Sequence, residues 1–199
     1  AAGKPWIAQT SSDLTAWGGC VGDRALPYDA NGAAADISTP ATLYQAIDAN
    51  YQVFPLPPLT SFFYPFTQPN PGAPCNNAPI MPLTTDFGAM YSAVAGMVAT
   101  GTTNLTVGLA WGLNVLTPGE PFGTANAFGG SHNKILVLLT DGLNTQSRWT
   151  SDTATMNAST RAMCDTIKSK GITIYTIGVM NEDAALLTYC ASTPAKHFF

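Results

Sequence analysis

The stretch Lys134-Ile135-Leu136-Val137-Leu138-Leu139-Thr140-Asp141-Gly142 decides the fold class, because five consecutive apolar residues are followed, after Thr140, by an acidic residue and a glycine. A strand that is buried on both faces of a parallel sheet has this appearance. A second apolar run, Ile172–Val179, follows after one helix-length stretch. Two such strands joined by a helix form a βαβ unit, which predicts an α/β fold with an open, mostly parallel sheet and helices on both faces. Ligands of such sheets bind beyond the carboxyl ends of the strands, so Asp141 is a candidate site residue.

Helical periodicity accompanies these strands in the second part of the chain. Apolar residues share one face of a helix in residues 87–98, 105–116, 156–167 and 184–189. We expect the apolar face of residues 105–116 to pack against the core, with Trp111 inside it. The order from residue 84 is therefore helix, helix, strand, helix, strand, helix, which describes the later half of an open α/β sheet.

The first part of the chain, residues 1–83, shows little periodicity. Nine of residues 55–82 are prolines, and aromatic residues are interleaved with them. Prolines at this density exclude regular structure, while the aromatic residues favour a loop packed on the core over a free tether. One short helix is predicted near Thr42–Ala49. We predict a single domain over residues 1–199, in which 1–83 form an irregular, proline-rich elaboration and 84–199 form the later half of the α/β core.

The cysteines are four in number: Cys20, Cys75, Cys164 and Cys190. No pair has the Cys-x-x-Cys spacing that indicates a zinc site or dithiol redox chemistry. We expect cysteines that are near one another in the sequence to form disulfides in an oxidising compartment, which gives the pairs Cys20–Cys75 and Cys164–Cys190. The first of these would tie down the proline-rich region. The alternative is four buried free thiols.

The composition excludes several classes of function. Only 10% of the residues are charged, with 12 acidic and 8 basic side chains, so no basic surface for nucleic acid or an anionic membrane is expected. No apolar run reaches the roughly 18 residues of a membrane span, and the chain does not open with a signal peptide. Abundant Ala, Ser, Thr and Asn with few lysines favour an exported protein, whose export signal would lie upstream of Ala1.

Several motifs occur in an order that is typical of a known family. They are Gly101-Thr102-Thr103-Asn104 at the start of a helix, Leu139-Thr140-Asp141-Gly142 at the end of a strand, and the strand Ile174-Tyr175-Thr176-Ile177-Gly178. This order resembles the later part of a von Willebrand factor A domain. More narrowly, the chain resembles the TadG-like proteins of bacterial tight-adherence (Flp) pilus systems in the segments Gly19–Arg24, Pro82–Thr84, Gly108–Gly112, Pro118–Phe122 and Leu186–Ser192. The similarity covers nearly the whole chain.

The resemblance implies a metal-ion-dependent adhesion site, which in A domains combines an Asp-x-Ser-x-Ser loop, a threonine and an aspartate. The threonine falls at Thr103 and the aspartate at Asp141. These oxygen ligands suit Mg²⁺, with Mn²⁺ or Ca²⁺ as substitutes, and leave room for waters and a partner's carboxylate. No Asp-x-Ser-x-Ser occurs in the 199 residues, so the chain carries half of such a site, and the absence of any cation is the alternative. A purely structural role stays open for both residues, at a strand end for Asp141 and near a helix N-cap for Thr103.

The missing loop implies a missing strand as well. In A domains the strand that bears Asp-x-Ser-x-Ser lies in the middle of the sheet, beside the strand that corresponds to Ile135–Leu139. An unpaired apolar edge at that place is a liability in a folded protein. We expect the first strand or strands to come from an upstream segment, separated by cleavage, or from a second chain; substitution by Trp6-Ile7-Ala8 is the alternative.

The predicted function is adhesive or structural rather than catalytic. By resemblance, the protein would act at the bacterial cell envelope or surface, in the periplasm or after secretion, in pilus assembly or attachment, and bind a protein partner through a divalent cation. The alternative is a secreted or periplasmic hydrolase whose active site is not recognised. Its histidines, His132 and His197, lie in no nucleophile motif such as Gly-x-Ser-x-Gly. A third reading is an A domain that acts only as a scaffold and binds no cation.

Overall fold

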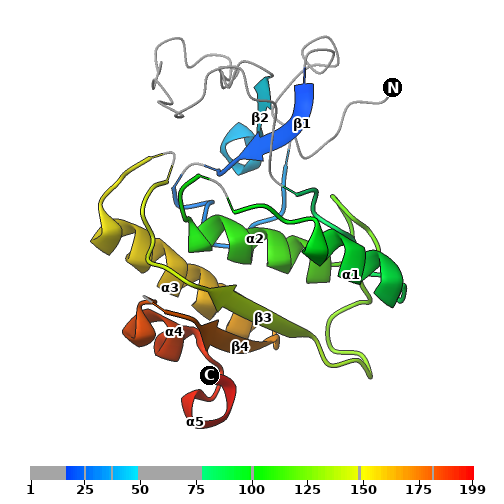
Figure 1. Cartoon of the computed structure of the whole chain (residues 1–199). Coiled ribbons are helices and arrows are strands. Elements are labelled where there is room, and N and C mark those ends of the chain that lie inside the picture. Colours follow the sequence, from blue (N-terminus) through cyan, green and yellow to red (C-terminus); the bar gives the residue numbers. More distant parts are fainter. Residues whose placement is uncertain are drawn as a thin grey trace.

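The computed structural model describes residues 17–24, 26–36, 38–48, 78–99, 101–147, 149–180 and 182–199. Its centre is a pair of parallel strands, β3 (Ile135–Thr140) and β4 (Thr173–Gly178), joined by helix α3 (Thr153–Ser169). This βαβ unit confirms the predicted α/β fold class (Figure 1). The register pairs Ile135 with Thr173 and Thr140 with Gly178, so the two strands end at the same edge.

Four more helices complete the described part of the chain: α1 (Phe87–Ala95), α2 (Leu105–Leu116), α4 (Ala184–Cys190) and α5 (Pro194–His197). Side chains of Asp86, Asn104, Asp152 and Asp183 cap the first turns of α1, α2, α3 and α4, respectively. Each accepts a hydrogen bond from the main-chain N–H group three residues later, which satisfies one of the donors that a helix leaves unpaired at its start. These caps fix where the helices begin.

The core lies on one face of the two-stranded sheet. Leu136 and Leu138 of β3 and Ile174 of β4 are buried there against α2, α3 and α4. Helix α2 approaches β3 closely at Gly112, where a Cβ atom would stand only 2.8 Å from Cδ1 of Leu136. Glycine therefore permits this close approach, because a Cβ atom here would require the Leu136 side chain or the helix to shift.

The opposite face of β3 is uncovered in the described residues. Ile135, Val137 and Leu139 alternate with the buried residues and are 52%, 58% and 63% exposed. On β4 the same face is contacted at Tyr175, whose ring lies 4.2 Å from that of His197 in α5. Helices are predicted on both faces of the sheet. Within the described residues, the only helix that contacts this second face is α5, which has four residues.

Helix α1 forms where the periodicity predicts a helix. Its residues share an apolar face as predicted, but none of them is buried, and Phe87 and Tyr91 are 79% and 78% exposed. Periodicity reports which residues lie on one face and not whether another element covers that face. The apolar face of α1 is therefore uncovered within the described residues.

The first part of the chain contains two short strands, β1 (Trp17–Gly22) and β2 (Gln45–Asp48), which pair with each other in antiparallel fashion. A short 3-10 helix at Pro40–Thr42 lies between them in the sequence. The helix predicted near Thr42–Ala49 is therefore wrong, because pairing with β1 outweighs the local helical preference. Residues 49–77, with most of the proline-rich segment and Cys75, lie outside the described residues. The predicted Cys20–Cys75 disulfide and the substitute segment around Trp6 lie outside them too.

Residues 24–44 pack on the α/β unit through a small aromatic cluster. Tyr44 and Trp111 of α2 are buried with ring centroids 4.7 Å apart, which confirms Trp111 as a core residue. The guanidinium of Arg24 lies 4.8 Å from the Tyr44 ring and donates to the carbonyl oxygens of Ala33 (2.6 Å) and Thr42 (3.2 Å). A buried cation is thereby given carbonyl and aromatic partners.

A disulfide joins α3 to α4, as predicted. Cys164 and Cys190 are both fully buried, and their bond closes a loop with a sequence separation of 26 residues. Disulfides persist in oxidising compartments, so the bond indicates a protein outside the reducing cytosol. None of the helices in the described ranges is long and apolar enough to cross a bilayer.

Candidate functional site at the carboxyl edge of the sheet

Asp141 follows directly after β3 and is exposed at the carboxyl edge of the sheet. The turn that presents it is held by the buried side chain of Thr140. The Oγ1 atom of Thr140 accepts from the N–H of Gly142 at 3.2 Å and donates to its carbonyl oxygen at 3.0 Å. The backbone on both sides of Asp141 is thus fixed while its carboxylate faces solvent.

Thr103 lies in the loop before α2, and main-chain bonds join this loop to the one that follows β3. The N–H of Thr103 donates to Oγ1 of Thr145 at 2.8 Å, and its carbonyl oxygen accepts from the N–H groups of Thr145 (3.0 Å) and Gln146 (3.4 Å). The structure therefore brings the two segments that carry the predicted site residues together. The side chain that caps α2 is that of Asn104 and not that of Thr103.

Asn144 is the residue that holds this edge together. It is 1% exposed, and its Oδ1 atom accepts from the N–H of Leu105, the first residue of α2, at 2.8 Å. Its Nδ2 atom donates to Oδ1 of Asn157 at 2.8 Å and to Oγ1 of Thr160 at 3.0 Å, both in α3. One amide thus bonds the loop after β3 to two helices.

The polar network continues beyond Asn144. The Nδ2 atom of Asn157 donates to Oδ2 of Asp183 at 2.8 Å, and Oδ1 of Asp183 caps α4 through the N–H of Leu186. The hydroxyl groups of Thr160 and Thr106 lie 2.9 Å apart in the core. Polar groups buried in this way rigidify a structure when all their partners are present. The start of α2, the body of α3 and the start of α4 therefore form one support beneath Asp141 and Thr103.

Sequence reasoning missed Asn144. It lies three residues after Asp141, where a loop asparagine is most simply interpreted as a solvated turn residue. The one indication of its role in the sequence is its position a few residues after the end of β3. The pairing with Leu105 and Thr160 depends on contacts across the fold, which no local pattern reports.

A complete cation site is not formed by the residues that the structure describes. Mg²⁺ prefers six oxygen ligands in octahedral geometry and is usually bound through one or two carboxylates and several waters. Asp141 and Thr103 are two ligand candidates at one edge, and the described ranges contain no group of three or more His, Cys, Asp or Glu side chains that could hold a metal ion. The donor set is thus consistent with half of an adhesion-type site.

A small cavity lies beside this edge, between Asp29, Thr106 and Ser159, with Trp149 in its lining. Its volume is about 20 Å³, which is room for one ordered water and not for an organic substrate. Burial raises the pKa of the Asp29 carboxyl above its ordinary value, although a hydrogen bond from Ser159 acts in the opposite direction. This cavity gives no catalytic site.

The parallel βαβ unit, the Gly-x-Thr-Asn turn before α2 and the Asp-Gly turn after β3 agree with a match between residues 77–199 and the von Willebrand factor type A domain. The chain belongs to the von Willebrand factor type A domain family. No curated protein and no solved structure matches the chain. Domains of this family commonly bind protein partners, and they can hold a divalent cation at an adhesion site.

Proposed function

We propose that this von Willebrand factor type A domain is a non-catalytic adhesion or structural protein that works by binding another polypeptide. The partner segment completes the sheet at the outer edge of β3. The observation that carries the proposal is that this strand is apolar, unpaired on one side and uncovered on one face within the described residues.

The unpaired edge follows from the hydrogen bonds of the parallel ladder. The N–H of Val179 donates to the carbonyl oxygen of Thr140 at 2.9 Å, so the main-chain groups of Thr140 point toward β4. Main-chain groups alternate in direction along a strand, and those of Ile135, Val137 and Leu139 therefore point to the other edge. Among the residues that the structure describes, no strand pairs with β3 there.

The uncovered face belongs to the same residues. The side chains of Ile135, Val137 and Leu139 are each more than half exposed, although they sit on a strand whose alternate residues are in the core. Strand addition is a common way of binding a peptide, with main-chain bonds for affinity and side-chain pockets for specificity. A partner that offers an extended apolar strand and further apolar cover fits both features.

The proposed partner segment is an upstream part of the same protein or a second chain that bears the Asp-x-Ser-x-Ser loop. It would set that loop next to Asp141 and Thr103, and the completed site would then hold a divalent cation. The resemblance to TadG-like proteins supports a place at the bacterial cell envelope or surface, in the assembly or attachment of tight-adherence pili. The oxidising compartment that the Cys164–Cys190 disulfide needs is consistent with that setting.

The partner can be tested on protein purified from its native source. We expect intact-mass and peptide analysis to find a second fragment with an apolar strand and an Asp-x-Ser-x-Ser loop. Val137→Lys should abolish its retention, because the substitution places a charge on the apolar face, whereas the control Leu26→Lys should not. Folded native material that contains this chain alone would refute the proposed partner.

The cation has a separate test on the same purified complex. Calorimetric titration with Mg²⁺ should show saturable binding that Asp141→Ala removes, because the carboxylate is the charged ligand that the chain supplies. Asp36→Ala, at an exposed aspartate on another loop, is the matched control. Binding that is unchanged by Asp141→Ala would contradict the cation site and leave the strand proposal standing.

A hydrolase is the second candidate, and the described geometry gives it little support. His132 is exposed in the loop before β3, at the edge opposite Asp141, and His197 packs on Tyr175. Labelling of the native protein by a serine-directed fluorophosphonate would favour the hydrolase over the adhesion protein.

A further inference from the structure

The loop that carries residues 30–33 across α2 and α3 contains an asparagine followed by a glycine, Asn31-Gly32, and this is the only Asn-Gly pair in the 199 residues. Asn31 is exposed, and Gly32 adopts the left-handed conformation with a φ of +61°. Because glycine has no Cβ atom, nothing on Gly32 shields its main-chain nitrogen from the side-chain amide of Asn31. The two residues can therefore react with each other.

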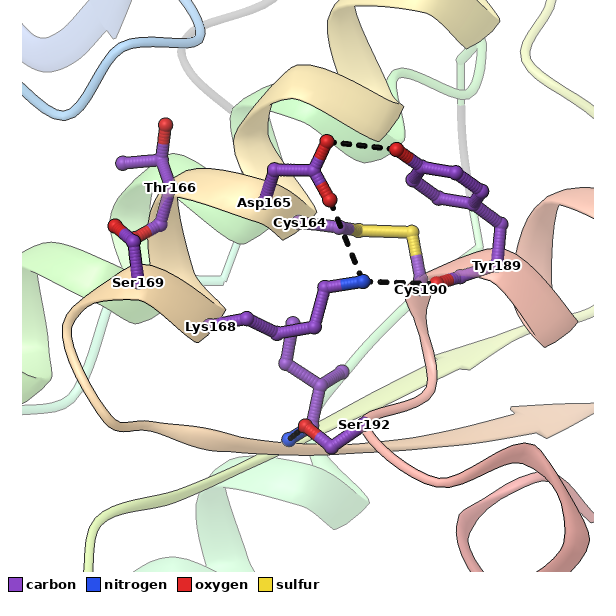
Figure 2. Close-up of polar contacts among 9 residues, drawn as sticks. Cys164, Asp165, Thr166, Lys168, Ser169, Tyr189, Cys190 and Ser192 are labelled. Carbon is purple, nitrogen blue, oxygen red and sulfur yellow. Dashed lines mark hydrogen bonds and ion pairs between the residues drawn. A yellow bond between two sulfur atoms is a disulfide. The ribbon is translucent and has the colours of Figure 1, made fainter.

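The residues on either side of Asn31 are anchored to the α/β unit. Ala30 is buried in the core, and its carbonyl oxygen accepts from the Thr166 hydroxyl of α3 at 2.9 Å. Figure 2 shows Thr166 on the side of α3 that faces away from the disulfide. Gly32 lies against both helices, since a Cβ atom there would stand 2.6 Å from Cγ2 of Thr166 and 3.0 Å from Cδ2 of Leu113. Asn31 thus bridges two fixed points.

The side chain of Asn31 forms a tight turn with the main chain that follows it. Its Oδ1 atom accepts from the N–H of Ala33 at 3.0 Å, which makes an Asx turn. The carbonyl oxygen of Ala33 accepts in turn from the guanidinium of the buried Arg24 at 2.6 Å. Within the described residues, the N–H of Gly32 has no hydrogen-bond partner. The side-chain carbonyl of Asn31 is therefore polarised, while the nitrogen next to it is not engaged.

This arrangement favours attack of the Gly32 nitrogen on Cγ of Asn31. The two groups are adjacent in the chain, so no encounter is needed to bring them together. Negative charge develops on Oδ1 as the new bond forms, and an N–H group that already donates to that oxygen stabilises the charge. That donor is the N–H of Ala33. The turn thus combines an electrophile, a nucleophile and an oxyanion donor in three consecutive residues.

We propose that Asn31-Gly32 is a self-modification site, at which intramolecular deamidation loosens the docking of residues 30–33 on α2 and α3. The product that loosens it is the isoaspartyl form, in which the main chain runs through Cγ of residue 31. The inference does not depend on the proposed partner, because it concerns the packing of the first part of the chain and not the edge of β3.

The chemistry needs only water. The Gly32 nitrogen loses its proton to water or hydroxide and bonds to Cγ of Asn31, the Cγ–Nδ2 bond breaks, and Nδ2 takes up a proton and leaves as ammonia. The resulting succinimide ring then adds one water at either of its carbonyl carbons. Cleavage of the bond between the Gly32 nitrogen and Cγ gives aspartate, whereas cleavage of the bond between that nitrogen and the main-chain carbonyl carbon gives isoaspartate. No electrons are exchanged, so no oxidant or reductant is required.

The two products fit the turn differently. Aspartate keeps the length of the main chain and the side-chain acceptor of the Asx turn. Isoaspartate lengthens the main chain between Ala30 and Gly32 by one carbon–carbon bond, about 1.5 Å, and moves the acceptor into the main chain. In a closely packed contact, Ala30 and Gly32 then cannot both keep their positions against α2 and α3. The isoaspartyl form should therefore release this loop and expose Arg24.

Ageing of the purified full chain at mildly alkaline pH, followed by peptide mass analysis, tests the chemistry. The peptide that contains Asn31 should gain the mass of an amide-to-acid conversion. Conversion at Asn31 should be about tenfold or more faster than at Asn133, which is also exposed but precedes a lysine. Asn31→Gln should lose the reaction, because its longer side chain has to close a larger ring. Equal rates at Asn31 and Asn133 would overturn the modification site.

Limited digestion with trypsin tests the release of the loop. Arg24 is 3% exposed and its guanidinium is bonded within the loop, so cleavage after Arg24 should be slow in the fresh chain. Chains that contain isoaspartate, counted with an isoaspartyl methyltransferase, should be cleaved there about tenfold faster or more. The matched control is Asn31→Asp, which adds the same charge without a longer main chain and should be cleaved like the fresh chain. Cleavage of the isoaspartyl chain no faster than that of Asn31→Asp would overturn the release.

Discussion

Replacing Asn144 by alanine is the most direct test of the support beneath the candidate site. The substitution removes three hydrogen bonds at once, to Leu105, Asn157 and Thr160, from a side chain that is 1% exposed. Each bond contributes about 1 kcal/mol net, and a buried group left without a partner costs about 1–3 kcal/mol more. We expect the free energy of unfolding to fall by about 4 kcal/mol.

Urea denaturation followed by circular dichroism measures this loss. With a slope of about 2 kcal/mol per M, the midpoint should move down by about 2 M. Asn133→Ala, at an exposed asparagine just before β3, is the matched control and should stay within about 0.5 kcal/mol of the unsubstituted chain. If Asn144→Ala costs no more than Asn133→Ala, the buried network does not support this edge and the reasoning fails.

Three further predictions concern the disulfide, a helix cap and helix packing. Removing the disulfide with Cys164→Ala and Cys190→Ala should cost about 3.5 kcal/mol, since the bond closes a loop with a separation of 26 residues; a loss below about 1 kcal/mol in thermal or urea unfolding would contradict this. Hydrogen bonds from the hydroxyl and N–H of Thr155 lower the pKa of Asp152, the α3 cap, below its ordinary 3.8. The stabilisation that the Asp152 carboxylate gives is therefore present at a pH above that ordinary pKa and is lost as the pH falls through the pKa of the folded state. Asp152→Asn should therefore make the free energy of unfolding depend less on pH in the acid range. An unchanged dependence would count against the cap. Gly112→Ala should lower the free energy of unfolding by about 1–3 kcal/mol through overpacking. Gly108→Ala, on the same helix with nothing within 4 Å of the new Cβ, should leave it unchanged or raise it. Equal effects of the two substitutions would refute the close approach of α2 to the sheet.

The parts of the fold that the sequence predicted are those set by runs of residue type. The apolar runs at Ile135–Leu139 and Ile172–Val179 contain the strands β3 and β4, whose residues Leu136, Leu138 and Ile174 lie in the core. Cys164 and Cys190, the two cysteines in the α/β part of the chain, are bonded because the helices that carry them, α3 and α4, flank the same strand. Family resemblance then located Asp141 and Thr103 on loops that the structure joins.

The remaining features depend on contacts between distant residues. The short helix expected near Thr42–Ala49 is a strand because β1 is available to pair with it. The periodicity of residues 87–98 predicts the helix α1, but no pattern along one chain tells whether its apolar face is covered. Asn144 is an ordinary turn residue by sequence, and its role depends on Leu105 and Thr160, which are distant in sequence but bonded to it in the fold.

Within the described residues, the unpaired edge and the uncovered face coincide on Ile135, Val137 and Leu139, and this bears on how the protein can be made. An apolar edge with exposed side chains is a site of aggregation, and the hazard begins as soon as β3 and β4 have paired. The segment that we propose to complete the sheet should therefore be at hand when the domain folds. A segment upstream on the same polypeptide meets this need without any search, because it leaves the ribosome before β3 does.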